Sequence, residues 1–233
     1  MRRTLTVLAF ALASAASPVA AQQSVNFNFG AFTPFREDAR SRSDGRSDDV
    51  LVNNLNFFDF EINDLDSATF GAEWLIALGS HAEAGLGLGF YSDAVDSVSR
   101  DYLNEDLNEI QQEFKLRIVP FTATFRFLPL GRTAAVQPYI GGGIGVFSWR
   151  YTESGEFVDL SDLTIFHDTF IGSGAEVGPV ILGGVRVPLG SWDLGGEIRY
   201  QKAEGDLPTD QGFSGSKIDL GGFNYLLTFN IRF

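Results

Sequence analysis

The stretch that most constrains the fold is the last one, Gly221 to Phe233, in which an apolar or aromatic residue occupies every second position. These residues are Phe223, Tyr225, Leu227, Phe229, Ile231 and Phe233. The residues between them are polar, apart from Leu226. Because successive side chains of a strand point to opposite faces, the pattern predicts a strand with one apolar and one polar face. A soluble sheet and a membrane barrel both contain such strands, so the rest of the chain must distinguish them.

The first 21 residues have the three parts of a secretory signal. Arg2 and Arg3 form a basic start, and an apolar segment follows at positions 5–16. Small residues precede a cleavage site that we predict after Ala21. The apolar segment is too short to remain as a spanning helix, which needs about 20 residues. We therefore expect residues 1–21 to be a cleaved signal peptide and residues 22–233 to form one exported domain.

Composition excludes several function classes. The chain has no cysteine, so it can form neither a disulfide nor a thiol catalyst. Its formal net charge is −13, which disfavours nucleic acid as a partner. No motif for a metal or a cofactor stands out, so we expect neither.

Alternating segments recur along the whole mature chain and predict eight strands. The predicted strands are 25–30, 68–79, 83–91, 114–127, 136–151, 181–187, 192–201 and 221–233. Long acidic connections alternate with short turns, and both ends of the mature chain fall on the side of the short turns. The long connections are 35–67, 92–112, 152–176 and 202–217. Within the first of them, Leu51 to Phe60 fits either a short helix or a strand extension.

The apolar positions change phase at Pro120. Before it, Phe114, Leu116 and Ile118 alternate with Lys115 and Arg117. After it, apolar residues stand at the odd positions 121–127. A β-bulge shifts the phase of a strand by one residue, and proline is tolerated at bulges. We therefore predict a bulge here that keeps both apolar sets on the same face.

The two faces of the predicted strands differ sharply. One carries bulky apolar side chains, and the other carries glycine together with charges of both signs. These charged residues are Glu73, Glu83, Lys115, Arg117, Arg126, Arg186, Asp193, Glu197, Arg199 and Arg232. The interior of an eight-stranded barrel is narrow and suits small and paired charged side chains, whereas lipid suits the apolar face. The pattern favours an all-β, eight-stranded antiparallel up-and-down transmembrane barrel over a soluble, lipocalin-like one.

A family resemblance supports this interpretation. The closing pattern of Tyr225, Leu227, Phe229, Ile231 and Phe233 is similar to the C-terminal signal that the barrel-assembly machinery reads in the small outer-membrane β-barrel superfamily. The stretch 137–143 resembles the entry to the fifth strand in that superfamily, which includes the OmpA transmembrane domain, OmpX and OmpW types. The resemblance implies an outer-membrane location in a Gram-negative-type envelope, contact with lipid, and recognition by that machinery. It specifies a class and no biochemical activity.

Three functions are compatible with such a barrel. The first is a structural or surface-interaction protein whose charged lumen is filled and whose extracellular loops carry the activity, with divalent cations as candidate partners of the acidic loops. The second is a narrow, porin-like channel for small or hydrophobic solutes, as the OmpW-type resemblance implies. The third is a lipid-modifying enzyme, which we do not expect because neither His81 nor His167 has a suitably placed serine. We expect a monomer.

Overall fold

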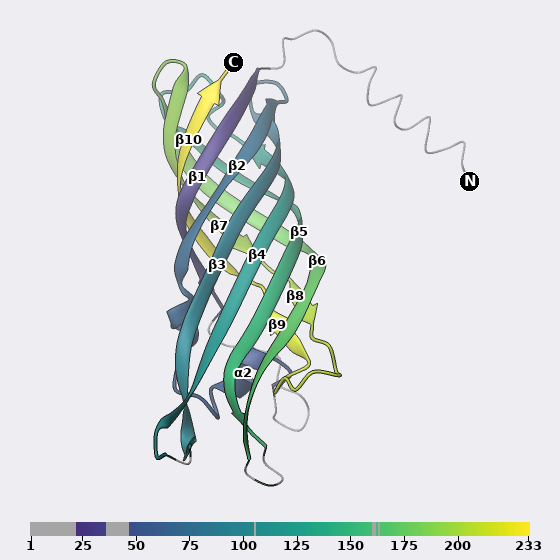
Figure 1. Ribbon diagram of the computed structural model, residues 1–233. Coiled ribbons are helices and arrows are strands. Elements are labelled where there is room, and N and C mark those ends of the chain that lie inside the picture. Colours follow the sequence, from purple (N-terminus) through teal and green to yellow (C-terminus); the bar gives the residue numbers. More distant parts are fainter. Residues whose placement is uncertain (1–21, 36–46, 105, 160–161, 163) are drawn as a thin grey trace, which may run out of the picture.

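A computed structural model describes residues 22–35, 47–104, 106–159, 162 and 164–233. The predicted signal peptide, 1–21, lies outside the described residues. Within them, eight strands close into a ring in the order β1-β10-β7-β6-β5-β4-β3-β2, and every neighbouring pair is antiparallel (Figure 1). The predicted eight-stranded antiparallel barrel is confirmed.

The ring strands differ in length. They are β1 (Gln23–Pro34), β2 (Ser67–Ala77), β3 (Ala82–Leu103), β4 (Glu109–Phe127), β5 (Gln137–Val158), β6 (Ile165–Pro188), β7 (Trp192–Gln201) and β10 (Gly222–Arg232). Four small elements lie in the described parts of the long connections: α2 (Val50–Asn54), the 3-10 helix η1 (Ile62–Leu65), and the paired strands β8 (Glu204–Asp206) and β9 (Lys217–Asp219). None of the helices in the described segments is long and apolar enough to cross a membrane.

The two ends of the barrel are unlike. The C-terminus and the start of β1 lie at one end, together with the short turns β2–β3, β4–β5 and β6–β7 (Figure 1). Gly79 and Gly190 each have φ +82° in these turns, a conformation that other residues adopt only with strain. The small elements lie toward the opposite end. We call these the short-turn end and the long-loop end.

The β3–β4 and β5–β6 hairpins extend much further than the sequence predicted. Residues 92–103 and 109–112 belong to β3 and β4, and residues 152–158 and 165–176 belong to β5 and β6. The prediction that 92–112 and 152–176 are loops was therefore wrong over most of their length. Acidic side chains such as Asp96, Asp101 and Asp168 are exposed to water and therefore do not break the ladders, whereas Glu153 is buried.

The bulge predicted at Pro120 is absent from the described register. Pro120 pairs with Phe147, and the pairing with β5 runs without a shift from Gln112 to Phe127. Outward residues such as Phe121 and Phe125 are exposed, whereas the inward residues Phe114, Leu116 and Ile118 are buried. The prediction that Phe114, Leu116 and Ile118 face lipid was wrong. The strand keeps its phase, and the surroundings of its outer face change from apolar to polar along its length.

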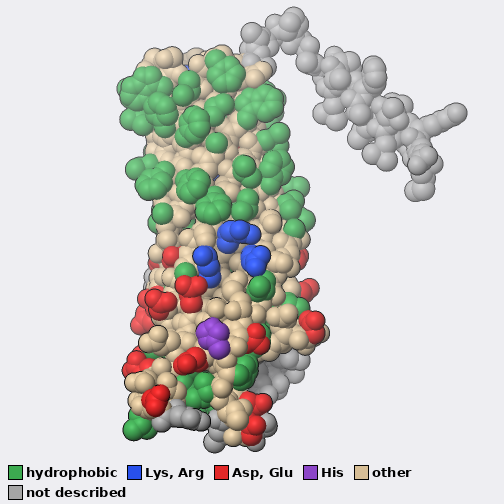
Figure 2. Space-filling view, in the orientation of Figure 1, with side chains coloured by type: hydrophobic (Ala, Val, Ile, Leu, Met, Phe, Trp, Pro, Cys, Tyr) green, Lys and Arg blue, Asp and Glu red, His purple; other side chains and the backbone are tan. Residues whose placement is uncertain are grey.

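Two zones follow from this change. Toward the short-turn end, large apolar side chains cover the outer surface, and toward the long-loop end acidic side chains replace them (Figure 2). A closed ring with an exposed apolar band satisfies its backbone hydrogen bonds in lipid, so we treat the first zone as membrane-spanning. In the second zone the barrel interior holds an apolar core that includes Phe147, Trp149 and Tyr151.

The long connections cap this core. Val50 and Leu51 of α2, Leu65 of η1, and Ile218 and Leu220 near β9 are all buried in it. Over Val50–Asn54 the chain is helical, so the first of the two alternatives for this stretch applies there. The side chain of Asp49 caps α2 by accepting hydrogen bonds from the backbone N–H groups of Leu51 and Val52, at 2.8 and 3.2 Å.

The two-zone surface predicts a position-dependent cost of charge. Ile198 on β7 is 53% exposed within the apolar band. Replacing Ile198→Arg should lower the free energy of unfolding in lipid vesicles by ~2–4 kcal/mol. Gln111→Arg, which places the same side chain on the outward face of β4 in the polar zone, should change it by less than about 0.5 kcal/mol. Equal effects of the two substitutions in urea titrations would contradict the zone assignment.

Candidate functional site

The interior of the membrane-spanning zone contains buried charges from three strands. Glu73 on β2, Arg126 on β4, and Glu197 and Arg199 on β7 form one cluster. The Arg126 guanidinium donates to Glu73 and, at 2.8 Å, to Glu197. The Arg199 guanidinium donates to Glu197 at 2.7 and 2.9 Å and lies 3.4 Å from Glu73. Two positive and two negative charges therefore balance inside the barrel.

Neutral groups complete this cluster. The Thr124 hydroxyl donates to Glu73 at 2.7 Å, and the Tyr139 hydroxyl donates to Glu197 at 3.0 Å. The Arg126 guanidinium also lies over the Tyr139 ring, 4.9 Å from its centroid. Such partners are needed because buried ions lose their hydration and must be compensated by hydrogen bonds.

Two smaller groups of ions lie toward the short-turn end. Arg186 donates two hydrogen bonds to the Glu83 carboxylate, at 2.5 and 3.0 Å, and Arg132 adds a third at 3.1 Å. The Arg232 guanidinium lies 2.6 Å from the Asp193 carboxylate. Each of these two carboxylates therefore accepts charge-assisted hydrogen bonds from at least one arginine.

The structure places the charges predicted for the lumen in two different locations. Eight of them are inward-facing and ion-paired: Glu73, Glu83, Arg126, Arg186, Asp193, Glu197, Arg199 and Arg232. Lys115 and Arg117 are instead exposed on the outer face of β4, so their assignment to the lumen was wrong. The error follows from the bulge that the strand does not have. Arg132 was missed because it lies in a turn, where alternation gives no signal.

The residues predicted to form the barrel-assembly signal share one face of β10 and its end. Tyr225, Leu227, Phe229, Ile231 and Phe233 are all exposed, between 38% and 72%. Their side chains belong to the apolar band. Recognition of this face by an assembly machinery stays a prediction.

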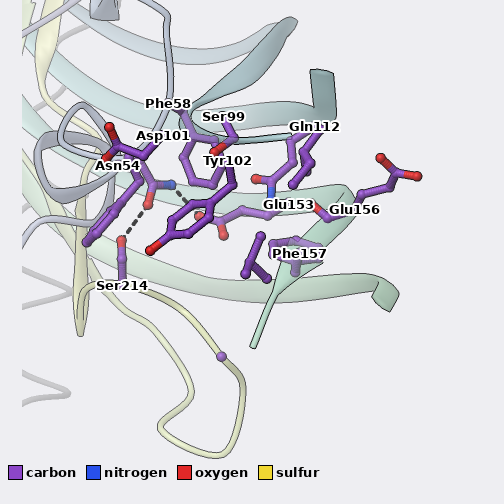
Figure 3. A pocket seen from close by; sticks show the side chains of 14 residues that line it. Asn54, Phe58, Ser99, Asp101, Tyr102, Gln112, Glu153, Glu156, Phe157 and Ser214 are labelled. Atoms are coloured by element: carbon purple, nitrogen blue, oxygen red, sulfur yellow. Dashed lines mark hydrogen bonds between the residues drawn. The ribbon is translucent and has the colours of Figure 1, made fainter. Parts of the chain in front are cut away.

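A pocket lies at the long-loop end, outside the membrane-spanning zone (Figure 3). Its volume is about 320 Å³, within the range of small-molecule sites. Four aromatic side chains line it, Phe57, Phe58, Tyr102 and Phe157. Among the described residues, the charged ones that line it are all acidic, namely Asp101, Glu153 and Glu156. The three acidic residues come from β3 and β5, and two of the aromatic residues follow α2. The pocket therefore depends on the strand extensions and on the long connections that cap the core, which we call the cap.

Glu153 is the buried acid of this pocket. It is 3% exposed, and its carboxylate accepts hydrogen bonds from the Asn54 amide at 2.7 Å and from the Tyr151 hydroxyl at 2.9 Å. Burial raises the pKa of Glu153 to about 7, although the two hydrogen bonds act to lower it. The carboxyl group therefore changes its charge near neutral pH.

Neighbouring polar groups hold the Glu153 carboxyl group in place, and the side-chain oxygen of Gln112 beside it has no hydrogen-bond partner among the described residues. The Ser214 hydroxyl donates to Asn54, which in turn donates to Glu153 (Figure 3). The Gln112 side chain is 4% exposed and lines the same pocket. Its Nε2 donates to the Glu156 carbonyl at 2.8 Å, but its Oε1 is buried without a hydrogen-bond partner among the described residues. A ligand that donates hydrogen bonds would satisfy this atom.

Sequence reasoning missed Glu153. A signal was present, because Phe147, Trp149 and Tyr151 alternate on the inward face and Glu153 continues the series. A carboxyl group that follows aromatic residues on a buried face is an unusual placement. The predicted strand ends at Tyr151, two residues before Glu153, because the acidic stretch that follows has the composition of a loop.

The turn β2–β3 contains one further contact. The Ser80 hydroxyl lies 2.7 Å from Nδ1 of His81, and both residues are exposed. The expectation that no serine lies within reach of His81 was therefore wrong. A serine and a histidine alone lack the orienting carboxylate and the oxyanion donors of a hydrolase, so the contact is no argument for catalysis.

Comparisons with known proteins find structural neighbours only. No family model and no curated protein matches the chain. Neisserial surface protein A has 11% identity and a TM-score of 0.47, with 91% of this chain and 97% of that chain covered. A major outer membrane protein from Thermus thermophilus has 15% identity and a TM-score of 0.45, covering 92% and 100%. The N-terminal β-barrel domain of Pseudomonas aeruginosa OprF has 11% identity and a TM-score of 0.39, covering 91% and 99%.

The structural neighbours of this chain are small eight-stranded outer-membrane barrels. They include barrels that are described as surface or attachment proteins, such as Ail, the attachment invasion locus protein of Yersinia pestis. The comparison concerns the fold and leaves the role of this chain to its own residues.

The buried ion cluster predicts strong energetic coupling. Arg126→Met leaves Glu73 and Glu197 with one arginine between them and should lower the free energy of unfolding by about 3–5 kcal/mol. The double variant Arg126→Met/Glu197→Gln restores the charge balance, because Arg199 can pair with Glu73, and should recover a large part of that loss. Lys202→Met, at an exposed cation, is the control. If urea titrations gave the same loss in free energy of unfolding for the single and the double variant, Arg126 would contribute no paired charge.

Proposed function

We propose that this protein is a closed barrel of the outer membrane that binds a ligand at its extracellular, long-loop end and conducts no solute. The orientation follows outer-membrane barrels in general, whose periplasmic turns are short and whose extracellular loops are long. The observation that carries the proposal is the aromatic and acidic pocket, which stands above an interior filled by ion pairs. The barrel is then an anchor, and the cap is the binding module. We do not propose an enzyme.

The alternative of a narrow channel has less support. A conducting path would have to pass Arg126, which forms ion pairs with both Glu73 and Glu197 across the interior. It would also have to pass the apolar core that α2, η1 and β9 complete. Both obstacles consist of packed side chains, so opening the path would require breaking buried ion pairs.

The lining of the pocket indicates the chemistry of its ligand. Glu153 and the unpartnered Oε1 atom of Gln112 can each accept a hydrogen bond from a ligand, and Asp101 and Glu156 add negative charge. The aromatic side chains provide an apolar surface, and their rings can face a cation. A ligand with an ammonium or guanidinium group on an apolar body fits this combination. A basic side chain of a peptide and a small aromatic amine share that chemistry.

Binding should depend on pH through Glu153. A bound cation favours the ionised carboxylate, and the pKa of Glu153 in the ligand-free pocket is about 7. As pH falls below this value the carboxyl group is protonated, so affinity should fall by up to about tenfold per pH unit. Phenethylamine, titrated calorimetrically into the refolded mature chain at pH 6 and pH 8, should bind more tightly at pH 8.

Three variants and one analogue make this test specific. Glu153→Gln should remove the pH dependence, and Phe157→Ala should weaken binding at both pH values. Glu113→Gln, on the outward face of β4, should behave as wild type. N-acetylphenethylamine, which has no charge, should bind weakly at either pH. Equal binding of the amine and its acetylated analogue would overturn the proposed ligand chemistry.

The closed interior is tested separately by conductance. In a planar bilayer, the mature chain should give no stable single-channel current, because the ion cluster and the capped core fill its lumen. A steady current that a small apolar solute blocks would reject the closed barrel and restore the channel. Binding of the amine by the same sample shows that the protein in the bilayer is folded.

A further inference from the structure

Three basic side chains gather on the outer surface of the barrel wall. Lys115 and Arg117 on β4 and Arg150 on β5 are exposed on the outward face. With Thr152 they line a hollow of about 310 Å³. Figure 2 shows a cluster of basic side chains between the apolar band and the acidic zone. The cluster is unexpected in a chain whose net charge is −13.

The three cations repel one another and have no carboxylate partner in the described part of the chain. Arg117 and Arg150 are directly paired positions of β4 and β5, and like charges directly opposite each other destabilise a sheet. Neither these two nor Lys115 forms an ion pair with a described residue. The arginines at 126, 132, 186, 199 and 232 all do. An anion from outside the chain would offset the repulsion.

The level of the cluster indicates where this anion comes from. On β4 the next outward residues toward the short-turn end are Val119 and Phe121, and on β5 Val146 and Ile144 follow beyond position 148. Phe121, Val146 and Ile144 are 53%, 42% and 63% exposed and belong to the apolar band. Arg117 stands four residues from Phe121, roughly 13 Å along the strand. The cations therefore lie where the hydrocarbon ends and headgroups begin.

We infer that Lys115, Arg117 and Arg150 bind the phosphate of a lipid headgroup in the outer leaflet of the membrane. Guanidinium groups bind phosphate through two parallel hydrogen bonds, and a lysine adds a third positive charge. The acyl chains of the same lipid would lie on the apolar band, where Phe121 and Val146 are exposed. The shared phosphate chemistry would also admit free phosphate, but the adjoining apolar surface favours a lipid.

The inference is tested by lipid retention. The refolded mature chain is placed in phosphatidylcholine nanodiscs that contain a small fraction of phosphatidic acid or of the matching uncharged diacylglycerol. Lipid that stays bound after transfer to detergent is measured by native mass spectrometry. Wild type should retain phosphatidic acid in preference to diacylglycerol. The variant K115Q/R117Q/R150Q should retain at least tenfold less of it, since each basic group near a membrane surface contributes a factor of about five.

Two controls separate the possible outcomes. K202Q removes another exposed cation that has no ion pair among the described residues, and it should retain lipid as wild type does. Unchanged circular dichroism of the triple variant shows that it folds, as expected when repulsion is removed. Equal retention by wild type and triple variant would overturn the inference. Displacement of the lipid by millimolar inorganic phosphate would show a free-phosphate site and would overturn the lipid as its ligand.

Discussion

Each long strand of this barrel passes from lipid into water, and its side chains must suit both surroundings. In the membrane-spanning zone, β4 directs Phe121 and Phe125 outward and Arg126 inward. In the polar zone the same strand, in unbroken register, directs Lys115 and Arg117 outward and Phe114 and Leu116 inward. The strand pairing is the same in both surroundings because the backbone hydrogen bonds are satisfied within the ring. Only the side chains differ between the part of the strand in lipid and the part in water.

The rest of the structure depends on that reversal. Where lipid solvates the outside, the narrow interior can hold charges only if they are paired, and Arg126, Glu73 and Glu197 are. Where water solvates the outside, the interior becomes an ordinary apolar core, which needs a cover at its open end. The first and last long connections supply it through α2, η1 and β9. The pocket around Glu153 exists because this cover is built from several separate segments.

The sequence predicted well those parts in which one environment acts along a whole strand. Alternation in 192–201 and 221–233 predicted β7 and β10 nearly to their ends. It failed where the environment changes within a strand. The switch at Pro120 was interpreted as a bulge, which placed Lys115 and Arg117 in the wrong compartment. The acidic extensions of β3 and β5 were interpreted as loops, since composition does not distinguish a solvated strand face from a loop. The pocket was not predictable, because it joins residues from α2, β3, β4 and β5.

The phase of β4 is continuous while the surroundings of its two faces reverse. Spin labels placed one at a time along residues 113–127 test this most directly. In lipid vesicles, labels at the outward positions 121, 123 and 125 should be accessible to oxygen, which concentrates in lipid. Labels at 113, 115 and 117 should be accessible to a water-soluble nickel complex, and labels at 114, 116 and 118 to neither. Oxygen accessibility at 114, 116 and 118 would place these residues in lipid and would contradict the account.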